Sequence, residues 1–161
     1  LTEAAARVQA PAIAADRADA TGWLFLGRAA ALPYAAEGAL KLEEISYRWA
    51  QSYPAGELKH GPIALVEEGT PAVLIHSGDR AALATSAAEV AARGARIVHL
   101  DADGVLRAEL SDPPGPGPRA SAPWGPLAAL PALQHLARSL AQVLGRDVDR
   151  PRNLAKSVTV V

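Results

Sequence analysis

Residues 71–100 read PAVLIHSGDRAALATSAAEVAARGARIVHL, and this stretch decides the fold class. It begins and ends with a short apolar run, at 71–76 and 95–100, and apolar residues recur at helical spacing within 80–93. We therefore predict a strand, a helix and a second strand. Because a continuous apolar run is typical of a strand buried on both faces, the two strands belong to a parallel sheet that helices cover.

The same two patterns extend outward from this unit. Residues 23–27 (WLFLG) form another apolar run, residues 105–110 a weaker one, and residues 126–144 carry leucine at helical spacing up to Gly145. The alternation predicts an α/β fold, a three-layer αβα sandwich with a parallel, doubly wound sheet. Ligands of such sheets bind beyond the carboxyl ends of the strands.

We divide the chain into three parts. Residues 1–20 form a helical lead-in, in which Pro11 predicts one kinked helix or two short ones. Residues 21–145 form the α/β domain. Residues 146–161 turn polar and then alternate, which predicts an extended C-terminal tail. The PPGPGP run at 113–118 is expected in a surface loop.

Composition narrows the function classes. The 161 residues suit one domain or part of a larger protein, and we expect no membrane partner because no apolar run has the length of a membrane span. Sixteen basic residues against seventeen acidic ones, with no basic run, predict no nucleic-acid partner. The absence of cysteine excludes a thiol nucleophile and agrees with a cytoplasmic location. Because methionine is absent too, we expect an excised domain, a processed product or an incomplete sequence.

The densest polar chemistry lies in residues 37–65, EGALKLEEISYRWAQSYPAGELKHGPIAL. On a helix, four charged residues share one face: Glu37, Lys41, Glu44 and Arg48. A solvated ladder of i, i+4 ion pairs explains this stripe without any function, each pair contributing about 0.2–0.5 kcal/mol. The loop that follows presents Lys59 and His60, and Pro62 suits the first turn of a helix, so we expect an exposed His60.

Lysine is scarce in a chain that otherwise uses arginine, and three positions have it: Lys41, Lys59 and Lys156. Arginine cannot give up its proton, whereas a buried lysine can become neutral and form a Schiff base with a carbonyl. The pattern agrees equally with amine chemistry and with three ordinary surface lysines. Packed or capping histidines are expected where histidine ends or lies within an apolar segment: His76, His99 and His135. No spacing indicates a metal site, and no cofactor motif occurs.

A resemblance to a known family rests on three segments: EGALKLEEISY at 37–47, AGELKHGPIAL at 55–65 and DRPRNLAKSVTV at 149–160. Together with FLGR at 25–28, they resemble in identity, order and spacing the second of two sugar-isomerase (SIS) domains in the glutamine–fructose-6-phosphate amidotransferase family, the glucosamine-6-phosphate synthases. The likeness begins near Trp23 and is weakest between residues 101 and 123. It implies a SIS-type, flavodoxin-like sandwich without a cofactor.

The resemblance also implies a role for four residues. Glu44 would move a proton between C1 and C2 of the sugar with Lys41 in support, and Lys156 would form a Schiff base with the open-chain ketose. His60 would open the sugar ring from across a homodimer interface. These roles are chemically coherent, because one carboxylate can reach two adjacent carbons and an amine condensed with the ketone makes the proton more acidic.

Two departures from the family pattern avoid these four positions. Glu43 stands where a basic residue is common, and Val161 ends the chain where glutamate is usual. The phosphate-binding loops of the first SIS domain and the glutaminase domain have no counterpart in this chain. The resemblance therefore makes those two domains its partners and fructose 6-phosphate its substrate, converted to glucosamine 6-phosphate. A free-standing phosphosugar isomerase or deaminase-like protein, or a non-catalytic sugar-phosphate-binding module, is the alternative.

Overall fold

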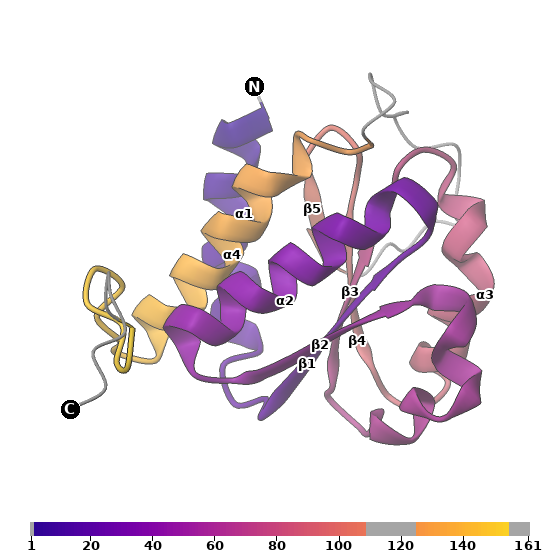
Figure 1. The fold of residues 1–161 in the computed structure, drawn as a ribbon, viewed down its shortest axis with the longest axis horizontal. Helices are drawn as coiled ribbons and strands as arrows, with labels where there is room; N and C mark the ends of the chain where they lie inside the picture. The colour runs from indigo at the N-terminus through magenta and orange to yellow at the C-terminus, as the bar shows by residue number, and fades with distance from the viewer. Residues whose placement is uncertain (1, 109–124, 155–161) are drawn as a thin grey trace.

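The structure, a computed structural model, describes residues 2–108 and 125–154, with side chains from Gln9 onward. Figure 1 shows how its α-helices and strands are arranged. Along the chain their order is α1 (Thr2–Asp16), β1 (Gly22–Gly27), α2 (Leu32–Ser46), β2 (Trp49–Pro54), β3 (Pro71–Ile75), α3 (Ala84–Ala91), β4 (Arg96–Leu100), β5 (Leu106–Ala108) and α4 (Ala129–Val143). Short 3₁₀ helices lie between them: η1 (Ala29–Ala31), η2 (Ala55–His60), η3 (Pro62–Leu65) and η4 (Arg80–Leu83).

The described strands form one sheet in the order β2-β1-β3-β4-β5. The first four strands of this order are parallel to their neighbours, and β5 pairs with β4 in the antiparallel direction. A parallel partner needs a crossover of a dozen or more residues, and the turn between β4 and β5 is too short for one. The doubly wound parallel sheet is thus confirmed, with an antiparallel strand added at one edge.

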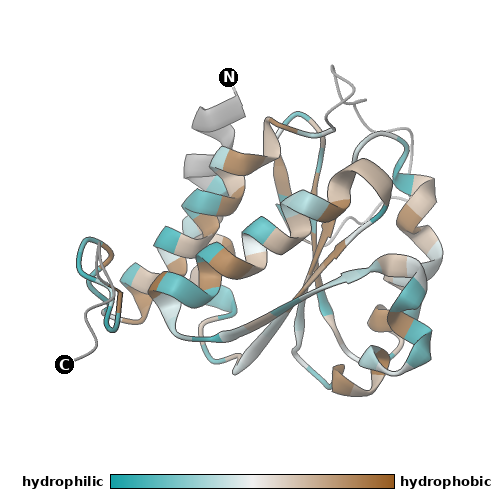
Figure 2. Ribbon diagram, viewed as in Figure 1, coloured by the Kyte–Doolittle hydropathy of each residue, from teal (hydrophilic) through white to brown (hydrophobic). Residues whose placement is uncertain are grey.

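Helices cover both faces of the sheet and complete the predicted three-layer sandwich (Figure 1). Alternate side chains of β1 point to opposite faces, so Trp23 and Phe25 pack with α1, α2 and α4, while Leu24 and Leu26 pack with η2 and α3. Figure 2 shows apolar residues in the middle of the sheet and hydrophilic residues on the outer surfaces of the helices. In the described part of the chain, no helix is long and apolar enough to cross a membrane.

The N-terminal helix belongs to the same hydrophobic core as the sheet. α1 is one helix that contains Pro11, so the prediction of two short helices is excluded. Its residues Ala10, Ile13 and Ala14 are buried in the cluster that α2 and α4 also enter. The Pro/Gly run at 113–118 and Lys156 lie outside the described residues.

A glycine sets the height of α2 above the sheet. A Cβ atom at Gly38 would lie 2.7 Å from Cδ2 of Leu133 on α4 and 2.9 Å from the ring of Phe25 on β1. A side chain at this position would therefore push α2 away from both neighbours. The absence of a side chain keeps the helix, and the charged residues that follow on it, close to the sheet.

Two expectations from the sequence are wrong in the segment after α2. The charged ladder loses its last member, because Tyr47 has a left-handed backbone with φ of 61° and ends the helix at Ser46. Arg48 leaves the helix face and donates instead to the carbonyl oxygen of Ala18 at 3.1 Å. Residues 49–54, expected as helix end and loop, form the edge strand β2.

Candidate active site

The last turns of α2 carry the first part of the site. Nζ of Lys41 donates to Oε2 of Glu44 at 2.6 Å and lies 3.9 Å from Oε1 of Glu37. The hydrogen bond with Glu44 raises the pKa of Lys41 above its ordinary value, against the opposing effect of burial. Lys41 is therefore protonated at neutral pH, and its positive charge lies directly beside the Glu44 carboxylate.

Glu44 lies at a pocket of about 370 Å³ between the end of α2, the start of β2 and the C-terminal segment. The lining residues come from these three segments: Glu43, Glu44, Tyr47, Arg48, Trp49, Arg152, Asn153 and Leu154. The volume lies within the range of small-molecule sites. A carboxylate next to an ammonium group, at the wall of a cavity, can take up and return a proton.

Glu43 holds one wall of this pocket in place. Its Oε1 accepts a hydrogen bond at 3.1 Å from the backbone N–H of Ala50 in β2, and its carbonyl oxygen accepts one at 3.2 Å from the N–H of Tyr47. These two bonds tie the end of the helix to the beginning of the strand. The residue that departs from the family pattern therefore has a structural role beside Glu44.

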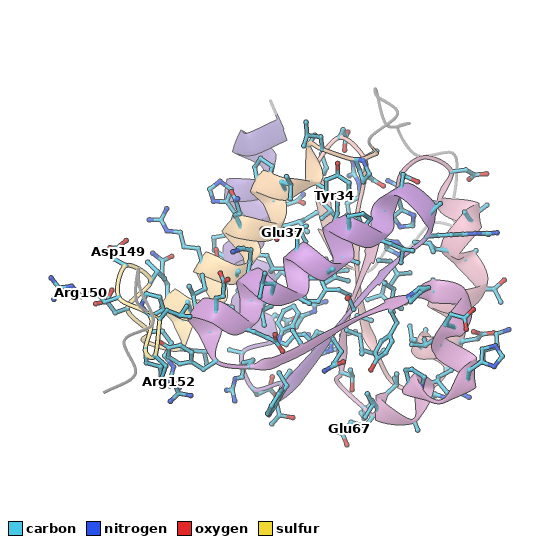
Figure 3. The ribbon with its side chains drawn as sticks, in the orientation of Figure 1. Tyr34, Glu37, Glu67, Asp149, Arg150 and Arg152 are labelled. Carbon is cyan, nitrogen blue, oxygen red and sulfur yellow. The ribbon has the colours of Figure 1, made fainter. Side chains whose placement is uncertain are left out.

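The C-terminal segment reaches the pocket through contacts with Tyr47. The backbone N–H of Arg152 donates to the Tyr47 hydroxyl oxygen at 2.9 Å, and the guanidinium carbon of Arg152 lies 4.2 Å from the centre of the tyrosine ring. Figure 3 shows Asp149, Arg150 and Arg152 on the loop beyond α4, next to the end of α2. Lys156 is two positions beyond Leu154, outside the described residues.

His60 and Glu44 lie at opposite ends of the edge strand β2. Glu44 precedes β2 and His60 is the last residue of η2, so the whole six-residue strand, about 20 Å long, lies between the segments that carry them. The structure therefore brings Glu44 together with Lys41 but not with His60 of the same chain. The imidazole is exposed, as the loop sequence predicts.

The segment that carries His60 is pinned to α3 although His60 itself is exposed. Leu58 is completely buried, and the buried hydroxyl of Ser86 on α3 donates to the carbonyl oxygen of Ala55 at 3.0 Å. Nζ of Lys59 lies 2.7 Å from Oε1 of Glu89 on the same helix. These contacts hold His60 in a fixed position on an outer surface.

The sequence predicts packed histidines at His76 and His99 but not the buried polar cluster in which they meet, at the carboxyl ends of β3 and β4. Nε2 of His76 and Nδ1 of His99 are 2.9 Å apart, and Asp101, fully buried, accepts hydrogen bonds from Arg80 and Arg107. Burial lowers the pKa of His76 to about 4, with a further contribution from His99, and burial also lowers the pKa of His99. Although burial raises the pKa of Asp101, its bonds to Arg80 and Arg107 hold that pKa below the ordinary value.

This cluster joins the ends of three strands and is structural. Both imidazoles are neutral at neutral pH, which agrees with the packed histidines expected from the sequence. The signal for the pairing is that His76 and His99 follow adjacent apolar runs, which parallel pairing brings to one edge. Within the described residues, no three His, Asp or Glu side chains gather as they would around a metal ion.

Comparison with known proteins gives the family. A model of the SIS domain matches residues 18–103. The glutamine–fructose-6-phosphate aminotransferase (isomerizing) of Acidithiobacillus ferridurans is 50% identical over 140 residues, which cover 85% of this chain and 23% of that protein. The enzyme of the same name from Aquifex aeolicus is 46% identical over 141 residues, or 85% of this chain and 24% of that protein. The chain thus spans about a quarter of the length of these curated relatives.

Solved structures show the same architecture. The C-terminal domain of glucosamine-fructose-6-phosphate aminotransferase from Francisella tularensis matches with a TM-score of 0.75 and 33% identity, over 93% of this chain and 44% of that one. A glucosamine-6-phosphate deaminase from Thermotoga maritima matches with a TM-score of 0.67 over 94% of this chain and 46% of that one; at 23% identity the likeness is one of fold. Because the family model matches more than half of the sequence and the fold agrees, the chain belongs to the SIS domain family.

Proposed function

We propose that this chain is the second SIS domain of a glutamine–fructose-6-phosphate aminotransferase and performs the sugar isomerisation that forms glucosamine 6-phosphate from fructose 6-phosphate. The observation that carries the proposal is the pocket in which Glu44 meets residues 152–154, two positions before Lys156. The names of the relatives support the substrate and the reaction. A broader statement of the same proposal is a sugar-phosphate isomerase domain.

The chemistry divides between Lys156 and Glu44. The neutral amine of Lys156 attacks the C2 ketone of open-chain fructose 6-phosphate, so that a C–N bond forms and water leaves. Ammonia derived from glutamine, the donor in the relatives' name, displaces the lysine and remains on C2. Glu44 then removes a proton from C1 and returns one to C2, which leaves an aldehyde at C1 and the amino group on C2.

The other two lysines are unsuited to the Schiff base. Lys41 is held protonated by Glu44, so it lacks the free electron pair that attacks a ketone. Lys59 is paired with Glu89 at the far end of β2. Lys41 instead supplies a fixed positive charge next to Glu44 while that carboxylate gains and loses its proton.

In this proposal a second copy of the chain and the other domains of the full-length protein supply the rest of the site. The whole of β2, about 20 Å long, lies between the segments that carry Glu44 and His60, so we propose that His60 opens the sugar ring at the site of a second copy in a homodimer. The phosphate group and the ammonia source are assigned to the first SIS domain and the glutaminase domain. The isolated chain should then be nearly inactive as a synthase.

Borohydride trapping on the full-length protein tests this proposal. Reduction in the presence of fructose 6-phosphate should leave the sugar on the peptide that contains Lys156. Lys59→Arg should be labelled like the wild type, and Lys156→Arg should take up no label at that position. Label at Lys41, or turnover without any trapped adduct, would contradict the assignment.

A further inference from the structure

We propose that Tyr47 is a positioning residue for this reaction: it docks residues 146–154 on the end of α2, beside Glu44. The inference rests on the proposed function, because it concerns the same pocket. It assigns a task to a side chain that takes no part in the proton or imine chemistry.

Three contacts join Tyr47 to the C-terminal segment. Its hydroxyl oxygen accepts the hydrogen bond from the Arg152 backbone at 2.9 Å. The guanidinium carbons of Arg152 and Arg146 lie 4.2 Å and 5.2 Å from the centre of its ring, within the range of cation–π attraction. Tyr47 therefore contacts the segment at both its beginning and its end.

The backbone at Tyr47 directs the ring toward this segment. A φ of 61° is uncommon for a residue with a Cβ atom and persists where surrounding contacts require it. It ends α2 three residues after Glu44, so the docking side chain and the proposed base share one rigid turn. Both Tyr47 and Glu44 line the pocket that Arg152 and Leu154 close from the other side.

The segment has little apolar burial of its own. Asp147 caps a local turn by accepting from the N–H groups of Asp149 and Arg150 at 3.0 Å and 3.2 Å. The side chains of Arg150 and Arg152 are exposed, so hydrophobic burial of the loop contributes little to its position. The contacts with Tyr47 are for this reason the chief constraint on where the segment lies.

Two substitutions separate the hydrogen bond from the stacking. Tyr47→Phe removes the acceptor for the Arg152 N–H and keeps the ring under both guanidinium groups. Arg152→Gln removes one stacked cation and keeps the backbone donor. Tyr53→Phe is the matched control. The Tyr53 hydroxyl donates to Oε1 of the exposed Gln51 at 3.1 Å, and Tyr53 does not line the pocket that contains Glu44.

Hydrogen exchange on the full-length protein measures docking directly. In Tyr47→Phe the amide of residue 152 should exchange about fivefold faster than in the wild type, the effect of losing one hydrogen bond. Tyr53→Phe should match the wild type. An unchanged exchange rate in Tyr47→Phe would overturn the docking, whatever the chemistry of the site.

Trapping kinetics measure the consequence for the reaction. The rate of borohydride-trapped label on Lys156 and kcat should both fall about fivefold in Tyr47→Phe, while KM for fructose 6-phosphate and the melting temperature stay close to wild type. Equal labelling of the two proteins overturns the positioning role and leaves the proposed function standing. Turnover by the wild type without label on Lys156 overturns both, and the exchange rates then report only whether the segment docks.

Discussion

The two ends of β2 are built differently. At its beginning, α2, the strand and the C-terminal segment of one chain converge on a pocket that contains Glu44. At its end, η2 is anchored to α3 but presents His60 on an open surface. Both ends carry a residue proposed for the same reaction, and the strand between them is about 20 Å long.

The difference agrees with the proposal that one chain forms the Glu44 pocket, whereas His60 acts at the site of a second copy. The proposed proton shuttle needs a base beside a charge partner, and the first end of β2 has Glu44 at the wall of a pocket with Lys41 bonded to it. The other end is rigid without being enclosed, which is the form expected of a group that works at another subunit's site. Rigidity and enclosure are thus independent properties of this fold.

The largest effect is expected from Glu44→Gln in the full-length protein. The amide keeps the shape of the side chain but cannot take up the proton, so kcat should fall by about a thousandfold. Glu37→Gln is the matched control, since Glu37 also approaches Lys41 but does not line the pocket. Equal losses in the two variants would show that the charged stripe, and not a single base, supports the reaction.

Mixing two inactive variants tests the division between the ends of β2. When Glu44→Gln and His60→Ala subunits are unfolded together and reassembled, about a quarter of wild-type activity should return, because half of the dimers are mixed and each has one intact site. Dimers of either variant alone serve as controls. If mixing restores nothing, His60 acts within its own chain and the second end of β2 has no partner subunit.

Acid should weaken the carboxyl edge of the sheet first. The pKa of His76 is about 4 in the folded chain and 6.5 in its ordinary state, so the unfolded chain binds the proton first as pH falls. The contribution of His76 to the free energy of unfolding is fully present above pH 6.5. It should decrease by about 3 kcal/mol as the pH falls to 4. Urea unfolding of wild type and His76→Asn checks the value: the variant should lack this part of the decrease. An identical pH dependence would contradict a buried neutral imidazole.

The smallest effect is expected where the His60 segment is anchored at its surface. Lys59→Met breaks the exposed ion pair with Glu89 and should reduce the rate of sugar-ring opening by about threefold or less. Glu89→Gln should do the same, and the double variant should be no slower than either single one, since both remove one interaction. Additive losses would mean that Lys59 or Glu89 has a separate contact in the assembled protein.

Sequence reasoning predicts the buried parts of this fold and misses one edge. The strands β1, β3 and β4 are predictable because they are covered on both faces and are continuously apolar. β2 has one neighbour and includes the exposed Trp49 and Gln51, so no apolar run indicates it. The end of α2 is equally hidden, because Tyr47 adopts a left-handed backbone without being glycine.

The sequence indicates candidate residues for the site, but it does not indicate which segments of the chain come together to form it. The motif indicates Lys41 and Glu44, but the sequence predicts i, i+4 ion pairs, whereas in the structure Lys41 bonds to Glu44 three positions on. Nothing in the sequence indicates that residues 152–154 lie beside them, because this depends on tertiary contacts with Tyr47. The catalytic roles of Lys41, Glu44, His60 and Lys156 all stay predictions.

The packing of α1 against α4 has a consequence for how the chain folds. These helices are the first and last of the described part, and both enter the core on one face of the sheet. Closing a loop of roughly a hundred residues is entropically costly and makes folding slow. During synthesis, Trp23 and Phe25 have no cover from α4 until almost the whole domain has left the ribosome, and in that interval the growing chain is prone to aggregate.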